Sequence, residues 1–556
     1  MKAAHSTPSS FVASANLISR IAFLANAFSL ATAQSPSSIP TQTTYLRPLN
    51  ADCVAQELGL VDLGSGTYFP SSYVLAPPSP TTEVINSAAD GFSVEYKDSY
   101  KIVENRISNI TYVLYECGTD RPSADQVPAG SVFFQVPLTS VSVAETVPYA
   151  YLEALEVVDR VTDVSAYTTS ACGQKLVECG FVSPNYVDFS TFEVNETSLD
   201  LGKAKADAII LGTAGAGQPA PVLAFDAEND PGLLNRAEWI KYLGLFFNKE
   251  RQAETLYNAI VDRYEEEKKL SEQADAASAG GSPVIAWVSH FTYDNEEHFD
   301  VSFAGYKQDL VEDASAKLPS ESAQALVEAT PGARLSAFSN ETVEFAWDDP
   351  SGVNGAKTFA SKKEAVAAFQ KLLSEVDAIV DETYAMDPAT YDFQAEYGFA
   401  APALTYRVDG KLSADNGYDW FESSFVRPDL MLRDFVRITD SVRAGKNVTP
   451  DGFEFTWLRH LDEKPVVVEA KDCARITECG QEAKPICPFV RSCGDGTTAL
   501  LREDEGNAAS CGEACCYESC TAVAGMTKEG AAQMAAPAVI LITLLVVFVE
   551  ALLQFC

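Results

Sequence analysis

The segment AEWIKYLGLFFNKERQAETLYNAIVDRYEEEKKL, from Ala237 to Leu270, is the longest uninterrupted amphipathic stretch of this 556-residue chain. Its apolar residues recur at spacings of three and four, which predicts a helix with one apolar stripe. The stripe consists of Trp239, Leu243, Phe246, Phe247, Ala253, Leu256, Ile260 and Tyr264. Upstream of it, Asp230 is a natural N-cap and Pro231 suits the first helical position.

A single helix over this segment would be longer than one domain is wide. At 1.5 Å per residue, a helix from Pro231 to about Ala274 spans roughly 60 Å, so it must contact two separate bodies. The helical pattern weakens at Asn248 and Lys249, where a slight break is expected. The sequence therefore predicts a linking helix within residues 229–276.

Patterns of strands and helices alternate on both sides of this segment. In residues 89–228, strands are expected at 92–105, 107–118, 132–137, 140–144, 160–167, 207–212 and 221–226, and helices at 147–158 and 198–206. In residues 277–446, strands are expected at 283–289, 342–347, 377–384 and 403–412, and helices at 306–318, 361–376 and 427–442. Such alternation predicts an α/β fold of two lobes with mainly parallel sheets, joined by one long helix.

The N-terminal end of the chain carries a targeting pattern. The first twenty residues lack acidic side chains, and the apolar run from Ile21 to Ala33 ends in small residues. This is typical of a secretory signal peptide over residues 1–33, cut before Gln34. A buried N-terminal helix is the alternative, but the Ser/Pro/Thr-rich lead-in over residues 34–88 is poorly suited to packing against it.

Residues 522–556 form a C-terminal tail that is almost wholly apolar from Ala535 onward. A membrane span needs about 20 apolar residues, and this tail has enough. No Lys or Arg follows it, and small residues with a short polar spacer precede it, which favours a GPI-anchor signal. A true transmembrane helix and a buried core helix are the alternatives.

Cysteine usage indicates an oxidising compartment. Eight of the 13 cysteines lie between Cys473 and Cys520, and they predict a disulfide-rich module over residues 473–521, after a connector at 447–472. Zinc binding by this module is disfavoured, because it has neither C-x2-C pairs nor histidine partners. Among the earlier cysteines, Cys172 and Cys179 are the obvious local pair, and the sequence leaves the rest of the connectivity open.

Four N-x-T acceptors for glycosylation point to the surface of a eukaryotic cell. They begin at Asn109, Asn195, Asn340 and Asn447. The formal net charge of −38 opposes binding to nucleic acid or anionic headgroups and enriches cations nearby. Simple solubility is an equally good reason for this charge.

Three stretches resemble the helical-backbone family of periplasmic binding proteins, which captures iron siderophores, haem, vitamin B12 or bare metal ions for membrane transporters. Residues 221–270 contain the family's pattern of LG, then K-E-x-x-A-E, then R-Y. Residues 136–167 resemble its strand, cleft loop and helix with LEAL. Residues 417–442 contain its terminal pattern P-D-x-x-L-x-D. The likeness covers about Phe92 to Ala444. The family is mostly bacterial and works with ABC transporters, so a glycosylated, anchored form departs from its usual setting.

The resemblance implies a ligand site between the lobes, at loops that follow the carboxyl ends of strands. The candidate ligand-binding residues are Glu145, Tyr149, Tyr167 and Thr213 in the first lobe, and His290, Tyr293, Tyr384 and Trp420 in the second. Their aromatic rings suit a bulky chelate or tetrapyrrole by stacking and apolar contact. Ordinary packing within the lobes is the alternative role of these rings.

A bare metal ion would need about four His, Asp or Glu ligands facing one point. His290 directly follows a buried strand and Glu145 lies in a facing loop, so these two residues are the candidate metal ligands. His298 lies in a segment, DNEEHFD, that is expected to be an acidic loop. Solvated or capping histidines are the plainer alternative.

The sequence favours a binding protein over an enzyme, because it contains no G-x-S-x-G, H-E-x-x-H, Walker or dinucleotide motif. We expect capture of an iron chelate (siderophore), haem, a corrinoid such as cobalamin, or Fe(III) at the cell surface for uptake. The expected partners are the ligand, the membrane through the tail, and an uptake receptor or transporter, with no nucleic acid. The alternative is a non-catalytic interaction or adhesion module that kept the fold.

Overall fold

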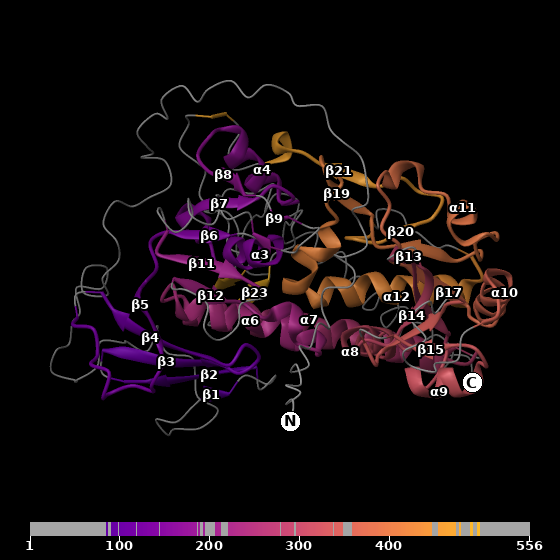
Figure 1. The fold of residues 1–556 in the computed structure, drawn as a ribbon, viewed down its shortest axis with the longest axis horizontal. Coiled ribbons are helices and arrows are strands. Elements are labelled where there is room, and N and C mark those ends of the chain that lie inside the picture. The colour runs from indigo at the N-terminus through magenta and orange to yellow at the C-terminus, as the bar shows by residue number, and fades with distance from the viewer. Residues whose placement is uncertain are drawn as a thin grey trace, which may run out of the picture.

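The computed structural model describes two lobes and the helices between them (Figure 1). The described residues are 91–185, 206–212, 221–446 and 454–473, with gaps at 98, 118, 144, 279, 294–295, 337–338 and 348–358, and short segments at 85–86, 187–188, 193–194, 478–479, 490–492 and 498–500. The predicted signal peptide, nearly all of the lead-in, the C-terminal tail and the acceptors Asn195 and Asn447 lie outside them.

The first lobe begins with a five-stranded sheet in the order β1-β2-β3-β4-β5. Its pairs are antiparallel except for the parallel β4–β5 pair. The strands are β1 (Ile85–Asn86), β2 (Phe92–Tyr96), β3 (Tyr100–Asn105), β4 (Ile110–Glu116) and β5 (Val132–Val136). Tyr112 and Phe134 pack edge-on against Phe246, which joins this sheet to the lobe's core.

A second sheet in the first lobe is wholly parallel, in the order β12-β11-β6-β7-β8. Its strands are β6 (Val141–Val143), β7 (Val161–Ser165), β8 (Ser183–Asn185), β11 (Ala208–Leu211) and β12 (Val222–Ala224). Helix α3 (Thr146–Ala154) follows β6, and α4 (Ala171–Glu178) follows β7. Chain order reverses between β6 and β11, which makes that position the topological switch point, where open α/β sheets bind ligands.

The helix predicted from Pro231 to about Ala274 is divided into α6 (Leu233–Leu245) and α7 (Glu250–Ala277). The chain turns at Asn248, whose φ of 54° is left-handed. Asn tolerates this conformation better than most residues do. The slight break expected at this point is therefore a complete interruption of the helix.

The two helices form an antiparallel hairpin. Gly244 of α6 lies against Ala253 of α7, and a Cβ at Gly244 would be 3.0 Å from the Ala253 Cβ. Further from the turn, the Lys241 ammonium lies 4.1 Å from the centre of the Tyr257 ring. The close approach at Gly244 therefore sets how tightly the hairpin packs.

Helix α7 alone is the long helix that joins the lobes. Its 28 residues span roughly 40 Å. Leu256 and Ile260 pack in the core of the first lobe, and Tyr264 packs in the core of the second lobe. Tyr264 also donates a 2.6 Å hydrogen bond to Asp313 of α8 (Gly305–Asp313). The expected contact with two bodies is therefore made by α7.

The second lobe is built on a seven-stranded sheet in the order β15-β16-β14-β13-β17-β18-β20. The strands are β13 (Ile285–Tyr293), β14 (Glu296–Ser302), β15 (Arg334–Leu335), β16 (Thr342–Phe345), β17 (Ala378–Asp381), β18 (Thr405–Arg407) and β20 (Arg459–His460). The pairs β13–β17 and β17–β18 are parallel, and the outer pairs are antiparallel. The predicted α/β class with two lobes is confirmed.

Strand β14 corrects one expectation, because DNEEHFD is not an acidic loop. Phe299 and Val301 alternate with His298 and Asp300, and all four side chains are buried. A period of two is the strand signature. The period of two was not recognised in the sequence, because the second face of the strand carries charged residues and is nevertheless buried.

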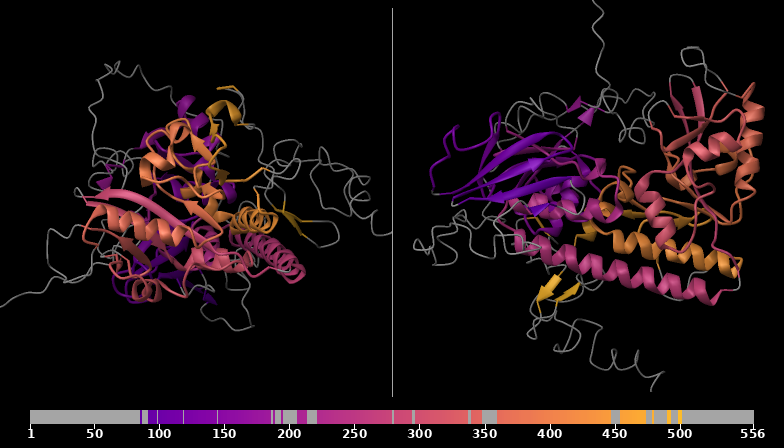
Figure 2. Two further views of the ribbon diagram at one scale, coloured as in Figure 1. Left: turned by 90° about the vertical axis from the view of Figure 1, so that its right-hand side faces the viewer. Right: turned by 90° about the horizontal axis from the view of Figure 1, so that it is seen from below.

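The helices of the second lobe surround its sheet. They are α8, α9 (Ala323–Ala329), α10 (Lys362–Leu373), α11 (Phe393–Tyr397) and α12 (Pro428–Ala444). Figure 2 shows α12 running beside α7. Arg263 of α7 lies 3.7 Å from Asp429, and Asp275 lies 3.1 Å from Arg443, so the two helices run in the same direction. Helix α12 therefore braces the second half of α7.

A C-terminal strap, which we define as residues 466–473, contacts both lobes. Its strand β21 (Val466–Val468) pairs with β19 (Lys411–Ser413) of the second lobe. Its 3-10 helix η7 (Ala470–Asp472) packs on α4 of the first lobe. The strap thus ties the two lobes together.

Two disulfides tie Cys473 of the strap and Cys479 beyond it to the two ends of α4, and they correct the predicted pair of Cys172 with Cys179. Cys172 is bonded to Cys473, and Cys179 to Cys479. Cys172 and Cys179 are separated by nearly the whole length of α4, which is roughly 10 Å at 1.5 Å per residue. A disulfide spans at most about 7 Å between Cα atoms, so the local pair cannot form.

Candidate functional site

The lobes meet where the loop after β7 contacts η5 (Asp419–Phe421) and Glu422. The Glu422 carboxylate accepts hydrogen bonds from the backbone N–H groups of Thr169 and Ser170 at 2.6 and 3.1 Å. The Thr169 hydroxyl donates to Asp419 at 2.5 Å. We call these bonds the interlobe contacts. They join the carboxyl end of a first-lobe strand directly to the second lobe.

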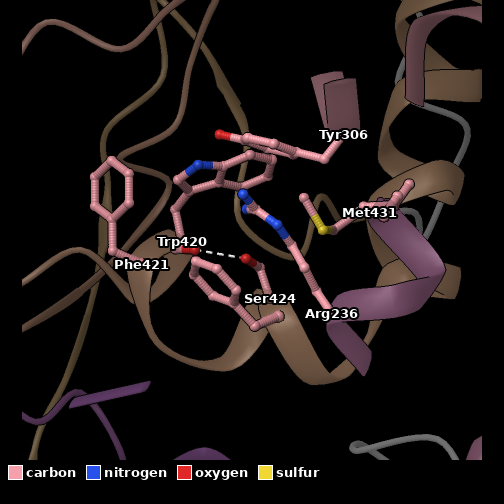
Figure 3. A pocket seen from close by; sticks show the side chains of 8 residues that line it. Arg236, Tyr306, Trp420, Phe421, Ser424 and Met431 are labelled. Atoms are coloured by element: carbon pink, nitrogen blue, oxygen red, sulfur yellow. Dashed lines mark hydrogen bonds between the residues drawn. The ribbon is translucent and has the colours of Figure 1, made fainter. Parts of the chain in front are cut away.

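A small cavity lies at the junction of the lobes (Figure 3). It is lined by Leu233 and Arg236 of α6, Tyr306 of α8, Trp420 and Phe421 of η5, Ser424 and Phe425 of η6 (Ser423–Val426), and Met431 of α12. Its volume of about 20 Å³ is enough for about one water molecule. The lobes are therefore closed on one another at this point.

Arg236 supplies the cation of this cavity. Its guanidinium lies 3.8 Å from the centre of the Tyr306 ring, and Figure 3 shows it extending toward the rings of Tyr306 and Trp420. Its Nε donates to the carbonyl of Asp230 at 2.8 Å, and its Nη2 donates to the carbonyl of Glu228 at 3.1 Å. Aromatic faces attract such a cation, so Arg236 is held in place from two sides.

A buried ion pair adjoins the cavity in the second lobe. Lys307, next to Tyr306 on α8, pairs with Glu382, which follows β17. The Lys307 ammonium also lies 5.0 Å from the Trp287 ring. Burial opposes its charge, but Glu382 raises the pKa of Lys307 above its ordinary value. Oε1 of Glu382 and Nε1 of Trp287 are buried, and neither has a hydrogen-bond partner within the described chain.

Glu145 lies at the switch point of the first lobe, between the ends of β6 and β11. Its Oε2 accepts a 2.6 Å hydrogen bond from the backbone N–H of Gly212. A Cβ at Gly212 would lie 2.4 Å from that oxygen, so a larger residue there would displace the Glu145 carboxylate. Burial raises the pKa of Glu145 to about 8, and the nearby Glu228 carboxyl adds to the rise. Burial also raises the pKa of Glu228 to about 7, partly offset by Arg236.

The structure brings some of the predicted ligand-binding residues together across the junction. Burial raises the pKa of Tyr384, and the nearby Tyr167 of the first lobe adds to the rise. The Tyr384 ring also stacks on that of Tyr418 at 5.3 Å. Trp420 lines the cavity, and its ring lies 5.8 Å from that of Trp287. Of the predicted ligand-binding residues, Trp420 thus lines the cavity, whereas Tyr167 and Tyr384 meet elsewhere at the junction.

Other predicted residues lie elsewhere. Tyr149 is fully buried in the first lobe, where its ring edge would lie 3.2 Å from a Cβ at Gly173 of α4. Thr213 lies outside the described residues, and so does the side chain of Tyr293 at the end of β13.

The two candidate metal ligands are not brought together. His290 is part of β13 rather than of a loop, and its Nδ1 lies 2.6 Å from Glu396 of α11. Its ring stacks on Phe299 at 4.7 Å. Glu145 belongs to the first lobe and is bound there to Gly212. Each residue thus has its own partners, in a different lobe.

Sequence reasoning missed Arg236, Tyr306, Lys307 and Glu382. Arg236, Tyr306 and Lys307 lie on helices, where no local pattern separates a cavity residue from an ordinary helical one. Glu382 directly follows the apolar strand β17. A carboxylate in that position is expected to be buried, and this was the sequence signal that could have identified Glu382. Asp419 and Glu422 lie within two residues of Trp420, which was a predicted ligand-binding residue.

No protein-family model and no curated protein matches the sequence. Among solved structures, the chain resembles a periplasmic haem-binding protein from Pseudomonas aeruginosa, with 12% identity, 59% of this chain and 99% of that one covered, and a TM-score of 0.36. It also resembles the periplasmic vitamin B12-binding protein BtuF of Vibrio cholerae, with 10% identity, 55% and 98% covered, and a TM-score of 0.33.

A third similar structure is an Fe3+-hydroxamate transport protein from Saccharomonospora viridis, with 14% identity, 46% of this chain and 77% of that one covered, and a TM-score of 0.29. The resemblance expected from the sequence is thus also found among solved structures. At these identities and TM-scores we take the fold from the chain's own sheets and helices, and nothing about the ligand from these proteins.

Proposed function

We propose that this protein is a non-catalytic binding protein that captures a small ligand between its two lobes. The observation that carries this proposal is a pair of buried polar atoms in the second lobe, Nε1 of Trp287 and Oε1 of Glu382, which have no partner in the described chain. Such a donor and acceptor cost free energy unless something binds them. Trp287 lies 5.8 Å from Trp420 of the cavity lining, and Glu382 pairs with Lys307, which is next to Tyr306 of that lining. A cavity near the meeting point of two lobes is a usual place for a ligand.

The chemistry of the junction supports an anionic chelate or a flat conjugated ligand. Arg236 and Lys307 supply positive charge, and Tyr306 and Trp420 supply ring faces. Haem combines carboxylates with a flat ring, an anionic iron siderophore supplies the charge, and a corrinoid supplies the conjugated ring; Fe(III) itself, a cation, is the member of the proposed set that these residues support least. Because the cavity holds about one water, these ligands enter only when the interlobe contacts separate.

We propose that capture takes place at the cell surface, on a chain anchored by its tail, with an uptake receptor or transporter as partner. The two disulfides support an oxidising compartment. Asn109 and Asn340 are exposed, as glycosylation acceptors must be. Within the described ranges, no helix is both long and apolar enough to cross a membrane; the predicted anchor lies beyond those ranges.

Native mass spectrometry of the protein as isolated tests this function, followed by melting-temperature measurements with haem, cobalamin and ferric hydroxamates. A capture protein gains stability from its ligand, by about 2.7 kcal/mol at a concentration one hundred times Kd. Trp420→Ala should abolish the gain, whereas Met386→Ala, at a position that is 66% exposed, should keep it. An equal gain in both variants would place the ligand elsewhere.

An interaction or adhesion module is the second candidate. The water-sized cavity and the direct bonds between Glu422 and the first lobe favour it, because the lobes contact each other directly and leave no room for a ligand between them. A melting temperature unchanged by every ligand of the panel supports this role over capture.

A further inference from the structure

The sheet of the second lobe carries a polar cluster that does not line the cavity. His298 and Asp300 are two residues apart on β14, so their side chains lie on the same face of the strand. Asp300 is directly opposite Glu344 of β16. One nitrogen or oxygen atom from each of the three side chains lies within 4.8 Å of the others. All three residues are at most 5% exposed.

Asp300 points to a missing cation in this cluster. Its Oδ1 has no hydrogen-bond partner in the part of the chain that the structure describes. It also faces a second carboxylate, and like charges directly opposite each other on neighbouring strands are destabilising. Burial and the Glu344 charge raise the pKa of Asp300 well above its ordinary value. The carboxyl must therefore either keep a proton or bind a cation.

We propose that His298, Asp300 and Glu344 bind one divalent transition-metal ion, for which Zn2+ is the best match. Imidazole nitrogen and carboxylate oxygen are both zinc ligands, and water can fill the fourth position of a site with three protein ligands. The two carboxylates also neutralise the two positive charges of the ion. This site is separate from the proposed capture of a ligand between the lobes.

Neighbouring side chains hold two of the ligands in place. The Phe291 ring, opposite His298 on β13, stacks on the imidazole with a centroid distance of 4.8 Å. Arg334 Nε donates a 2.9 Å hydrogen bond to Oε2 of Glu344. Outer contacts of this kind orient metal ligands. Ligand atoms around a tetrahedral zinc lie roughly 3.4 Å apart, so binding draws the three side chains inward by about an ångström.

Zinc binding at this site should depend on pH, because zinc binds carboxylates and imidazoles in their deprotonated forms. Zinc affinity should therefore rise with pH. Lys307 and Arg334 are the cations that face Asp300, and Glu344 is the facing carboxylate. A cluster that merely shares a proton would show no such metal binding.

The full chain, stripped with EDTA and then titrated with Zn2+, tests this site. We expect native mass spectrometry to find one zinc ion that raises the melting temperature, and Co2+ to give the visible absorption of a four-coordinate site. Asp300→Asn and His298→Gln should each weaken zinc binding by at least about tenfold. No bound zinc in the wild-type protein would overturn the proposal.

Two controls separate metal binding from folding. Asp300→Asn resembles the protonated side chain, so the metal-free variant should melt like the metal-free wild type. His290→Gln changes the neighbouring buried histidine, which pairs with Glu396 at 2.6 Å, and should leave zinc binding intact. Equal zinc affinity in the wild type and in Asp300→Asn would locate the metal elsewhere and refute the assignment.

Discussion

Glu422 shows at the residue scale how a buried carboxyl joins the lobes. It accepts hydrogen bonds from the loop after β7, and burial raises its pKa to about 8, with the neighbouring Asp419 adding to the rise. The pKa of Asp419 itself is lowered, because Lys411 and its hydrogen-bond donors outweigh its burial. The proton that this pair holds near neutrality therefore resides on Glu422.

The junction should consequently weaken as pH rises. A carboxyl whose pKa is raised from 4.5 to about 8 stabilises the closed lobes fully below pH 4.5 and loses that stabilisation as pH rises through about 8. The melting temperature of the wild type should therefore fall between pH 5 and 9. Glu422→Gln, which imitates the protonated form, should show a shallower fall in calorimetry.

Other carboxyls with raised pKa values, such as Glu145 and Glu228, contribute to the same trend. The test is therefore the difference between the wild type and Glu422→Gln in how steeply the melting temperature falls with pH. Glu272→Gln, on the exposed face of α7, should keep the full slope. Equal slopes for the wild type and Glu422→Gln would remove Glu422 from this role.

At the scale of elements, the α6–α7 hairpin depends on hydrogen-bond partners for the polar groups of its turn. A helix end leaves carbonyls without partners, and the buried Lys101 of β3 binds the carbonyl of Leu245, the Asn248 side chain and Glu250. Burial raises the pKa of Glu250 to about 7, and Lys101 limits the rise. The first sheet thus stabilises the turn that divides the predicted helix.

Gly244→Ala tests the packing of this hairpin. Ala favours a helix by about 1 kcal/mol over Gly, but the new Cβ would lie 3.0 Å from the Ala253 Cβ and 3.4 Å from the Lys249 carbonyl oxygen. We expect a net loss of about 1 kcal/mol in urea unfolding, because overpacking outweighs helix propensity. Gly281→Ala, with nothing within 4 Å, should be neutral. A stabilised Gly244→Ala variant would contradict the close packing.

At the scale of the whole molecule, the C-terminal strap fixes how the lobes sit. The disulfides at Cys473 of the strap and at Cys479 beyond it bridge sequence separations of 301 and 300 residues, and they begin at the two ends of one helix. Either bridge alone therefore closes nearly the same large loop. Once one bridge has formed, the other adds only a small ring made of α4 and the strap.

Removing these bridges should be strongly non-additive. Replacing Cys179 and Cys479 by Ser opens only the small ring of roughly 15 residues and should cost about 3 kcal/mol. Removing both bridges also opens the large loop and should cost more than twice as much, measured by guanidinium unfolding without reductant. Equal costs for the first and second removal would mean that the bridges do not share one loop.

How much the sequence could predict differs between these scales. Periodicity found most strands, because the alternation of side chains along a strand is a local signal. It did not find the reversal at Asn248, which depends on Lys101, a residue 147 positions away. It also placed His290 in a loop, because nothing local shows that β13 and β14 continue as a long hairpin.

By itself, the sequence determined the two α/β lobes and the long helix between them, since hydrophobic period and turn residues are properties of neighbouring residues. Only the tertiary structure decided that Cys172 bonds Cys473, that Arg236 meets Tyr306, and that Asp300 faces Glu344. The physical reason is that these contacts join distant segments whose meeting depends on sheet order and packing, which no local pattern encodes.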